Sequence, residues 1–321
     1  MNAENLIYYP DTQPGVSRRR CGRGFSYFDT SGHLIRNQHE RDRLNRLAVP
    51  PAYDDVWMCP VPNGHLQATG RDTKGRKQYL YHPDWTEARA EAKFDGLVEF
   101  GRSLPRLRRR VRQDLDENVG AREFAIAAAV TLIDRTGLRV GNPQYLKENG
   151  SRGALTLRGD HVALSGNRID LQYRAKGGQV VSRKMTDAVL ARVLGEINDL
   201  PGATLLSWTD DQGNPQALNS ETLNGYLADI TGIEGVTAKT FRTWVGTCVA
   251  FTTAEAGGAT IKEMAEAAAQ RLHNTPVVAR NSYIHPDVIA LAGRPAPRII
   301  PDERDGLRVA EQRLLGFLER L

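Results

Sequence analysis

The apolar and polar positions divide the chain into two parts of different texture. Up to about residue 85 the apolar positions fall in short runs bounded by Gly, Pro or Asn, which is typical of β-strands and turns. A helical stretch over 38–47 interrupts them and stops at Pro50-Pro51, because proline cannot continue a helix. The strands expected in this part are Gly24–Tyr27, Asp55–Met58 and Leu66–Thr69.

From Asp84 onward, apolar residues recur at helical spacing. The helices that this spacing predicts are Trp85–Leu104, Arg106–Glu117, Ala121–Thr136, Thr186–Asn198, Ser220–Ile230, Ala238–Ala256, Thr260–Arg271, Pro286–Ala292 and Asp305–Arg320. Pro105 is expected to end the first of them, and Gly137 is expected to stop the third, strongly apolar one.

Four short segments with alternating apolar positions are inserted between the third and fourth helices. They are Leu155–Leu157, Val162–Leu164, Ile169–Tyr173 and Gln179–Arg183. Glycine-containing turns separate them, as expected of antiparallel strands. The pattern therefore predicts an α+β fold. A small β-rich N-terminal domain covers 1–85, and a larger, mainly α-helical domain covers 86–321 with an inserted three- to four-stranded antiparallel sheet.

Length and composition fit two globular domains. The 321 residues are 40% hydrophobic and 25% charged, which allows a core in each domain. No apolar run approaches the roughly 18–20 residues that span a bilayer, and the N-terminus lacks the apolar stretch of a signal peptide. We therefore expect a cytoplasmic protein that makes no contact with a membrane.

Motifs that hold nucleotides or metals are missing from the sequence. It has no GxxxxGK phosphate loop, no GxGxxG after a strand and no HExxH. The cysteines Cys21, Cys59 and Cys248 lie far apart without CxxC spacing, which argues against a disulfide framework or a zinc site. No cofactor and no metal are expected.

The net charge of +5 permits nucleic-acid binding, so the distribution of the cations matters more than their excess. The segment 71–81 holds four cations, Gln78 and two tyrosines, which suit phosphates, base edges and sugars; a solvated β-hairpin is the alternative. Five arginines between 106 and 112 are expected to lie on a solvated helix surface, with phosphate contact by a subset as the alternative. Arg18-Arg19-Arg20 is a third cluster, compatible with a tail.

Four residues, in chain order, have the chemistry of a metal-free attack on a phosphodiester. They are Arg139, Lys176, Arg242 and Tyr283. Such a reaction needs a nucleophile, cations for the non-bridging oxygens and an acid for the leaving oxygen. Arginine suits the phosphate because its planar fork donates two parallel bonds. Each residue alone has an ordinary structural explanation, and the combination carries the signal.

The sequence resembles the type IB DNA topoisomerases, in the compact poxvirus-like branch that also occurs in bacteria. The order of the four residues carries this resemblance together with several longer segments over most of the chain. These are Val49-Pro50-Pro51, Val56-Trp57, Gln67-Ala68-Thr69-Gly70, Gly75-Arg76-Lys77-Gln78-Tyr79 and Tyr145-Leu146-Lys147-Glu148-Asn149. The resemblance implies relaxation of supercoiled duplex DNA without ATP, through a covalent 3′-phosphotyrosyl intermediate, strand rotation and religation.

The resemblance also implies a role for each site residue. Tyr283 is the nucleophile, and Lys176 is the general acid for the 5′ oxygen, with Arg139 as a candidate relay for that proton. Arg139 and Arg242 stabilise the charge of the phosphorane. A monomeric, two-lobed clamp around duplex DNA, associated with the nucleoid, is expected. The DNA contacts implied are Lys74, Arg76, Lys77, Gln78, Tyr79, Tyr81, Tyr145 and Lys147.

One position departs from the family pattern. The family usually carries a histidine nine residues before the tyrosine, where this chain has Asn274, while His273 stands one residue earlier. If the segment is helical, one residue is about 100° of rotation, so His273 points elsewhere. We therefore expect Asn274 to take the role, as an uncharged amide donor to a non-bridging oxygen. His273 as a slipped substitute is the alternative.

Two other functions fit parts of the pattern. A site-specific tyrosine recombinase uses a similar Arg, Lys, Arg, Tyr set, but it normally has a helical N-terminal domain, which the segment 75–79 argues against. A non-enzymatic DNA-binding protein of the same fold would bind DNA without forming a covalent adduct.

Overall fold

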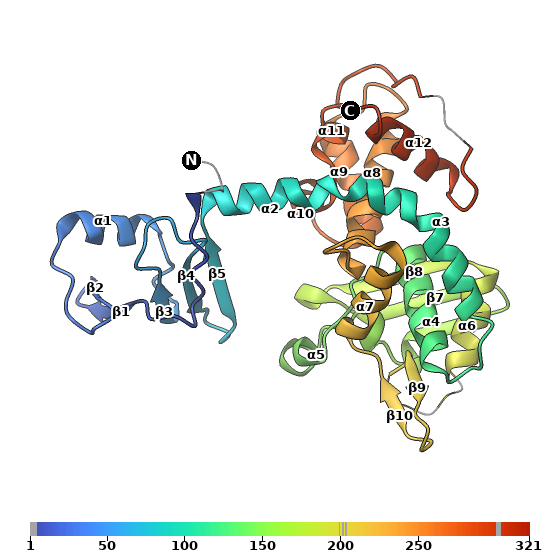
Figure 1. Ribbon diagram of the computed structural model, residues 1–321, viewed down its shortest axis with the longest axis horizontal. Coiled ribbons are helices and arrows are strands. Elements are labelled where there is room, and N and C mark those ends of the chain that lie inside the picture. The colour runs from blue at the N-terminus through green and yellow to red at the C-terminus, as the bar shows by residue number, and fades with distance from the viewer. Residues whose placement is uncertain (1–4, 199, 201, 203, 300–302) are drawn as a thin grey trace. The chain divides into compact units, whose positions relative to one another are not determined.

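The computed structural model describes residues 5–198, 200, 202, 204–299 and 303–321, apart from the side chains of 90–93 and 145. The chain divides into two compact units, Met1–Phe94 and Asp95–Leu321 (Figure 1). The predicted boundary at residue 85 lies within helix α2 (Pro83–Asp95) and stays a prediction. Among the described helices, none has the combination of length and apolar character that crossing a membrane requires.

The first unit is built on a five-stranded antiparallel sheet with the strand order β2-β1-β3-β4-β5. Its elements before α2 are β1 (Val16–Cys21), β2 (Gly24–Phe28), α1 (Gln38–Arg46), β3 (Asp54–Met58), β4 (Leu66–Arg71) and β5 (Lys77–Tyr81). A small core holds the sheet against α1, and it consists of Val16, Tyr27, Leu44, Val56, Met58 and Ala68. The three expected strands and the expected helix are confirmed.

Strand β1 contains the arginine triplet 18–20, which is therefore not a tail. The Arg18 guanidinium donates hydrogen bonds to the carbonyls of Val49, Pro50 and Tyr53, at the Pro-Pro turn. It also lies over the Phe25 ring, with 4.0 Å between its central carbon and the ring centroid. Cation–π contact and carbonyl pairing thus place an arginine where the sequence pattern alone did not predict a strand.

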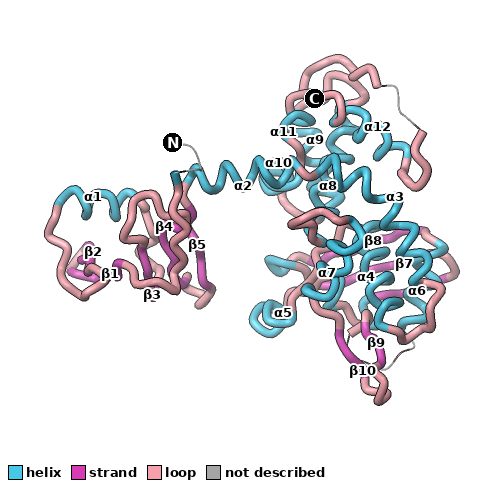
Figure 2. Tube along the Cα trace, viewed as in Figure 1, coloured by secondary structure: helices cyan, strands magenta, loops and turns pink. Residues whose placement is uncertain are grey.

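The second unit combines helices with a three-stranded antiparallel sheet, β6-β7-β8, and a two-stranded ribbon, β9-β10 (Figure 2). Its elements are α3 (Leu97–Asp114), α4 (Arg122–Thr136), α5 (Pro143–Asn149), β6 (Val162–Ser165), β7 (Arg168–Arg174), β8 (Val180–Thr186), α6 (Ala188–Asn198), β9 (Ser207–Thr209), β10 (Pro215–Ala217), α7 (Ser220–Thr231), α8 (Ala238–Ala254), α9 (Ile261–Leu272), α10 (Pro276–Tyr283), α11 (Pro286–Ile289) and α12 (Val309–Leu318). The α+β class and the inserted sheet are confirmed.

Helix α4 forms the centre of this unit. It is apolar on all sides and buried over almost its whole length, and it contacts α3, α6, α7 and α8 (Figure 1). As predicted, it ends at Gly137, which adopts the left-handed conformation with φ 66°. The backbone beyond Gly137 therefore turns sharply out of the core.

Three predictions about local structure are wrong. The helix expected over Trp85–Leu104 is interrupted at Gly96, between α2 and α3. Helix α3 continues through Pro105, because Phe100, Leu104 and Leu107 form one continuous, fully buried stripe along it. That burial outweighs the roughly 3 kcal/mol that a proline costs inside a helix. The expected strand at 155–157 is a 3-10 turn instead, since the Leu155 N–H pairs with the Val140 carbonyl rather than with a neighbouring strand.

Candidate active site

Helix α8 positions both Arg242 and the backbone of Tyr283. Arg242 lies in its second turn and is buried. One turn further along the same face, Gly246 leaves room for α10, because a Cβ there would lie 2.6 Å from the Tyr283 carbonyl oxygen. The next residue, Thr247, donates a hydrogen bond of 3.2 Å from Oγ1 to the same carbonyl. A single helix thus holds the expected cation beside the expected nucleophile.

Tyr283 is the last residue of α10. This helix begins with Thr275 as its N-cap and Pro276 in its first turn, a start signal that could have revealed it in the sequence. The Tyr283 ring faces the Arg242 guanidinium, with 4.9 Å between its centroid and the central guanidinium carbon. The nucleophile candidate therefore sits at the end of a short helix against a buried cation.

Arg139 lies just after α4, on a segment whose backbone packs closely against Gly153. The Arg139 carbonyl accepts a hydrogen bond of 2.8 Å from the Ala154 N–H. A Cβ on Gly153 would come within 2.4 Å of that carbonyl oxygen, so the two backbones can approach only because Gly153 has no side chain. The side chain of Arg139 reaches across to α9, where Nη1 donates a long hydrogen bond of 3.5 Å to the His273 carbonyl.

His273 and Asn274 lie between α9 and α10. His273 ends α9 in the left-handed conformation, with φ 48°, so the segment is not helical there and the rotation argument does not apply. Both residues line the same cavity of about 400 Å³, together with Val181 of β8. Burial and the charges of surrounding arginines lower the pKa of His273, which keeps its imidazole neutral at neutral pH.

The Asn274 side chain is unusual because its amide lacks a hydrogen-bond partner. Its oxygen and its nitrogen are both buried, and neither is paired within the described part of the chain. Leaving a buried polar group unpaired costs about 1–3 kcal/mol, so such a group calls for an explanation. An amide in this state is ready to bind a ligand group that enters the cavity.

Four arginines link the C-terminal ends of α4 and α9, and we call them the carbonyl-bound arginines: Arg139, Arg183, Arg242 and Arg271. Arg183 donates to the carbonyls of Thr136 and Arg271. Arg242 donates to the carbonyls of Gly137 and, at 3.0 Å, Leu272. Arg271 itself donates to the Arg135 carbonyl at 2.6 Å. The last carbonyls of a helix have no partners within it and carry its negative dipole end, so they suit cations.

Sequence reasoning missed two of these residues, Arg183 and Arg271. A signal for Arg183 was present, because Val181 and Arg183 share the buried face of β8 while their neighbours face solvent. A cation in an apolar position of an alternating strand indicates a buried partner. For Arg271 the sequence held no comparable signal, since a basic residue in the last turn of a helix is ordinary.

The carbonyl-bound arginines shift the pKa of Tyr283. Burial raises the pKa of its phenol, but the Arg242 charge, a hydrogen bond from Arg242 and the charges of Arg139 and Lys239 together lower the pKa below its ordinary value. In turn, burial and the neighbouring Arg139 lower the pKa of Arg242. At a given pH, the site therefore gives Tyr283 a larger phenolate fraction than an ordinary tyrosine has.

Lys176 lies in the turn between β7 and β8, as predicted, and its side chain is exposed. Gly177 and Gly178 follow it with φ of 80° and 77°, which makes the tight reversal possible. Within the described part of the chain, no polar contact joins its ammonium group to the other site residues. The structure thus brings together Arg139, Arg242 and Tyr283. Asn274 follows the His273 carbonyl that Arg139 contacts, and Lys176 stays at the tip of a hairpin.

In the first unit, the predicted DNA-contacting residues lie along the β4–β5 hairpin. Asp72 organises its turn: it pairs with Arg76 at 2.7 Å and accepts a hydrogen bond of 3.0 Å from the Gln78 amide. The Arg76 guanidinium and the backbone N–H groups of Arg76 and Lys74 lower the pKa of Asp72 to about 2. Lys74 is exposed in that turn and Lys77 pairs with Asp11.

Tyr79 and Tyr81 stack on each other in strand β5, with 6.2 Å between ring centroids, and both are about half exposed. In the second unit, Lys147 is exposed in the last turn of α5. The side chain of Tyr145, another predicted contact, lies outside the described residues.

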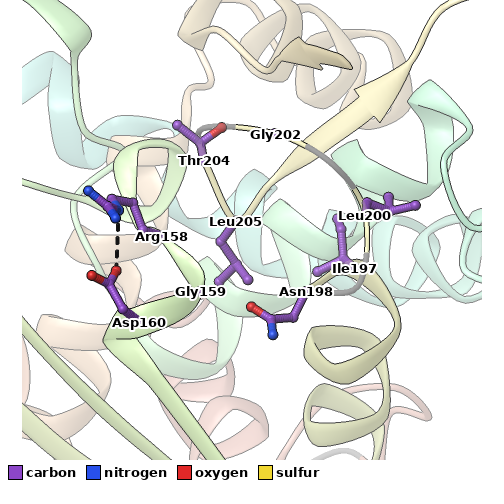
Figure 3. Close-up of a pocket in the computed structure, with 9 residues that line it drawn as sticks. All are labelled: Arg158, Gly159, Asp160, Ile197, Asn198, Leu200, Gly202, Thr204 and Leu205. Carbon is purple, nitrogen blue, oxygen red and sulfur yellow. Dashed lines mark ion pairs between the residues drawn. The ribbon is translucent and has the colours of Figure 1, made fainter. Parts of the chain in front are cut away.

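A second cavity, of about 480 Å³, contains none of the predicted site residues. Its lining includes Arg158, Asp160, Asn198 and Leu205, and the Arg158–Asp160 ion pair of 3.3 Å borders it (Figure 3). No cluster of three or more His, Cys, Asp or Glu side chains suited to a metal ion occurs among the described residues.

Comparisons with known proteins find matches over most of the chain. Residues 24–72 match the family model "Bacterial DNA topoisomerase IB, N-terminal domain". Residues 82–277 match "Eukaryotic DNA topoisomerase I, catalytic core". The second match covers more than half of the chain and includes Arg139, Lys176, Arg242 and Asn274; it ends before Tyr283. The chain belongs to the type IB DNA topoisomerase family.

The chain is also similar to DNA topoisomerases of viruses. "DNA topoisomerase 1B" of Acanthamoeba polyphaga mimivirus is 30% identical over 234 residues, which cover 72% of this chain and 69% of the relative. "DNA topoisomerase 1B" of Vaccinia virus (strain Copenhagen) is 24% identical over 124 residues, 39% of each chain. "DNA topoisomerase 1" of Rabbit fibroma virus (strain Kasza) is 25% identical over 137 residues. The resemblance seen in the sequence is confirmed.

Proposed function

We propose that this chain relaxes supercoiled duplex DNA by cutting and rejoining one strand, with Tyr283 as the nucleophile. The observation that carries the proposal is the contact between Tyr283 and the buried Arg242, beside Arg139. A phenol whose pKa is lowered by cations is a better nucleophile at neutral pH, and the same cations attract the phosphate that it attacks.

The reaction exchanges one phosphoester for another. The Tyr283 phenolic oxygen bonds to phosphorus, the bond to the 5′ oxygen breaks, and a proton reaches that oxygen as it leaves. The 3′ phosphate remains on Tyr283 as an ester, and the free 5′-hydroxyl strand rotates before it attacks in reverse. Because the ester keeps the energy of the original linkage, no ATP is required.

Arg139 and Arg242 stabilise the charge that develops on the non-bridging oxygens. Each of the two guanidinium groups has N–H donors left after its carbonyl bonds, and the buried Nε of Arg242 is unpaired within the described residues. The Asn274 amide supplies a neutral donor, and it follows the His273 carbonyl that Arg139 contacts. Loss of the usual imidazole charge at this position costs about 1–2 kcal/mol of transition-state stabilisation.

Lys176 is the general acid for the 5′ oxygen in this proposal. Its turn is exposed and carries two glycines, so it is free to move toward bound DNA. Arg139 remains the candidate relay for the proton. An exposed lysine meets its substrate only after binding, and a catalytic contact that is missing in a free enzyme does not speak against it.

A single copy of the chain is proposed to close around duplex DNA, at the nucleoid. The exposed side chains Lys74, Lys147, Tyr79 and Tyr81, together with Arg76, Lys77 and Gln78, would contact phosphates and sugars. The acidic partners Asp72 and Asp11 now hold Arg76 and Lys77, and a phosphate would compete for both cations.

Plasmid relaxation in EDTA without ATP tests the proposal, with the Tyr283→Phe variant beside the parent. The parent should relax a supercoiled plasmid that contains no recombination site and form a covalent protein–DNA adduct; the variant should do neither. Relaxation by Tyr283→Phe would sink the assignment of the nucleophile. A parent that binds DNA but forms no adduct would be a DNA-binding protein only.

Substitution at position 274 tests the proposed amide. Asn274→Ala should cleave more slowly than the parent, and Asn274→His should be at least as fast, because it restores the donor with charge. His273→Ala serves as the matched control, one residue away on the same cavity. If His273→Ala is slow and Asn274→Ala is not, the donor is His273.

A further inference from the structure

Arg183 has no part in the reaction as described above, yet it is a buried cation beside the reacting groups. Its exposed fraction is 8%, and it pairs across the sheet with Leu171 of β7, another buried residue. Burial and the neighbouring charges of Arg271 and Arg242 lower the pKa of Arg183 to about 10. Placing a charge there is costly, so its contacts need a reason.

Those contacts lie at equal distances along the chain from two expected phosphate-binding residues. One terminal nitrogen of Arg183 donates to the carbonyl of Thr136, three residues before Arg139. The other donates to the carbonyl of Arg271, three residues before Asn274. One planar guanidinium therefore joins the end of α4 to the end of α9, at the points from which both functional segments leave.

Arg242 makes a parallel bridge one residue further along each segment, from the Gly137 carbonyl to the Leu272 carbonyl. The Arg271 side chain adds a third link, to the carbonyl of Arg135. Successive arginine side chains thus join the two helix ends. Among them, Arg183 lies on β8, the strand that follows the Lys176 turn. Arg242 also contacts the Tyr283 ring.

We propose that Arg183 is a positioning residue, which sets the distance between the Arg139 and Asn274 segments so that both can hold one phosphate. This inference rests on the proposed function. A lysine cannot replace it, because an ammonium is a point donor on a flexible stem, while the planar fork of arginine fixes two acceptors at once. Misplacement of reacting groups by about 1 Å costs about 10²-fold in rate.

The test compares Arg183→Met, Arg183→Gln and Arg183→Lys with the parent, and Lys184→Met is the matched control. Lys184 is the next residue of β8, is 79% exposed and pairs weakly with Asp170. Adduct formation is followed in single turnovers on an end-labelled duplex, at a cleavage site first mapped with the parent. DNA affinity and the folded fraction are measured for each variant. Arg183→Gln, which keeps one donor, serves if Arg183→Met does not fold.

We expect adduct formation by Arg183→Met or Arg183→Gln to slow by about 10²-fold with DNA affinity unchanged. Arg183→Lys should recover only a small part, and Lys184→Met should match the parent. A second duplex with sulfur in place of the leaving 5′ oxygen needs no general acid. Because the fault lies in holding the phosphate, the slow rate should persist on it.

Three results would overturn the inference. The first is a parental rate in Arg183→Met and Arg183→Gln. The second is full recovery in Arg183→Lys, which would leave only a role for charge. The third is recovery on the sulfur duplex, which would place the fault in protonation of the leaving group. Failure of the proposed function is a separate result, because the parent itself would then form no adduct that depends on Tyr283.

Discussion

The second unit contains two clusters of buried or partly buried arginines that differ in what neutralises them. In the carboxylate-bound cluster, Arg108 and Arg308 pair with Asp134 and Glu311 at 2.7–3.1 Å. In the carbonyl-bound arginines, the acceptors are backbone carbonyls at the ends of α4 and α9. Within the described residues, no ion pair with a carboxylate is present for these four.

The two clusters meet on the last turn of α4. Asp134 of this turn receives Arg108, while the carbonyls of Arg135, Thr136 and Gly137 receive the other set. Two cations and two carboxylates cancel in the first cluster. Four cations in the second face two helix ends that carry about half a negative charge each, so roughly three positive charges remain. The first cluster is therefore suited to stabilising the fold, and the second keeps positive charge, as the proposed phosphate site requires.

The largest expected effect on the cleavage rate comes from a substitution among the carbonyl-bound arginines. Arg242→Ala removes the cation that faces Tyr283 and is expected to slow adduct formation by about 10²–10³-fold, as when one donor to a developing oxyanion is lost. Single-turnover cleavage at saturating DNA is the measurement. A rate close to the parental one would show that this cluster, like the other, is only structural.

A substitution in the carboxylate-bound cluster should lower the stability and leave the cleavage rate unchanged. Glu311→Ala leaves Arg108 and Arg308 without one carboxylate and removes the acceptor for the Trp244 indole N–H. We expect the free energy of unfolding to fall by about 3–5 kcal/mol, because a buried charge loses its partner. Denaturant unfolding measures this loss. The cleavage rate per folded molecule should stay parental; a loss as large as that of Arg242→Ala would remove the distinction between the clusters.

Gly246→Ala tests the packing of α10 on α8, which brings Tyr283 to the carbonyl-bound arginines. The new methyl group meets the Tyr283 backbone at 2.6 Å, so α10 must move away from α8. We expect a loss of about 1–3 kcal/mol in stability together with slower cleavage. The matched control is Gly225→Ala in α7, where a Cβ meets open space, and a gain of about 0.4–1 kcal/mol is expected there. Equal behaviour of the two variants would contradict the close contact.

The smallest effect is the one on the titration of Tyr283. The difference in phenolate absorbance between the parent and Tyr283→Phe should show a midpoint below 10, because the arginine charges outweigh burial. In an Arg242→Met background, measured against Arg242→Met with Tyr283→Phe, the remaining burial should raise the midpoint. Since the phenolate is the nucleophile, cleavage should accelerate as pH rises toward this midpoint. A midpoint that does not move would mean that Arg242 does not set the pKa.

Local structure followed the sequence where short-range signals agree. The apolar run of α4 with Gly137 after it, and the two glycines after Lys176, specify a helix end and a hairpin turn through backbone conformation alone. Pro105 misled because its local cost is overcome by a buried stripe that only the packed helix has. Helix α10 is short and has few apolar positions, so periodicity did not reveal it.

The sequence by itself determined which chemistry is available: Arg139, Lys176, Arg242, Asn274 and Tyr283 follow one another in an order that resembles the type IB topoisomerases, and the family is confirmed. Only the tertiary structure decided what those cations face. The carbonyls that accept from Arg183 lie 47 and 88 residues away along the chain, and those that accept from Arg242 lie 30 and 105 residues away. Every residue has such a carbonyl. The carbonyls that accept from these arginines are the ones exposed where α4 and α9 end, and the residue types at those positions do not indicate this.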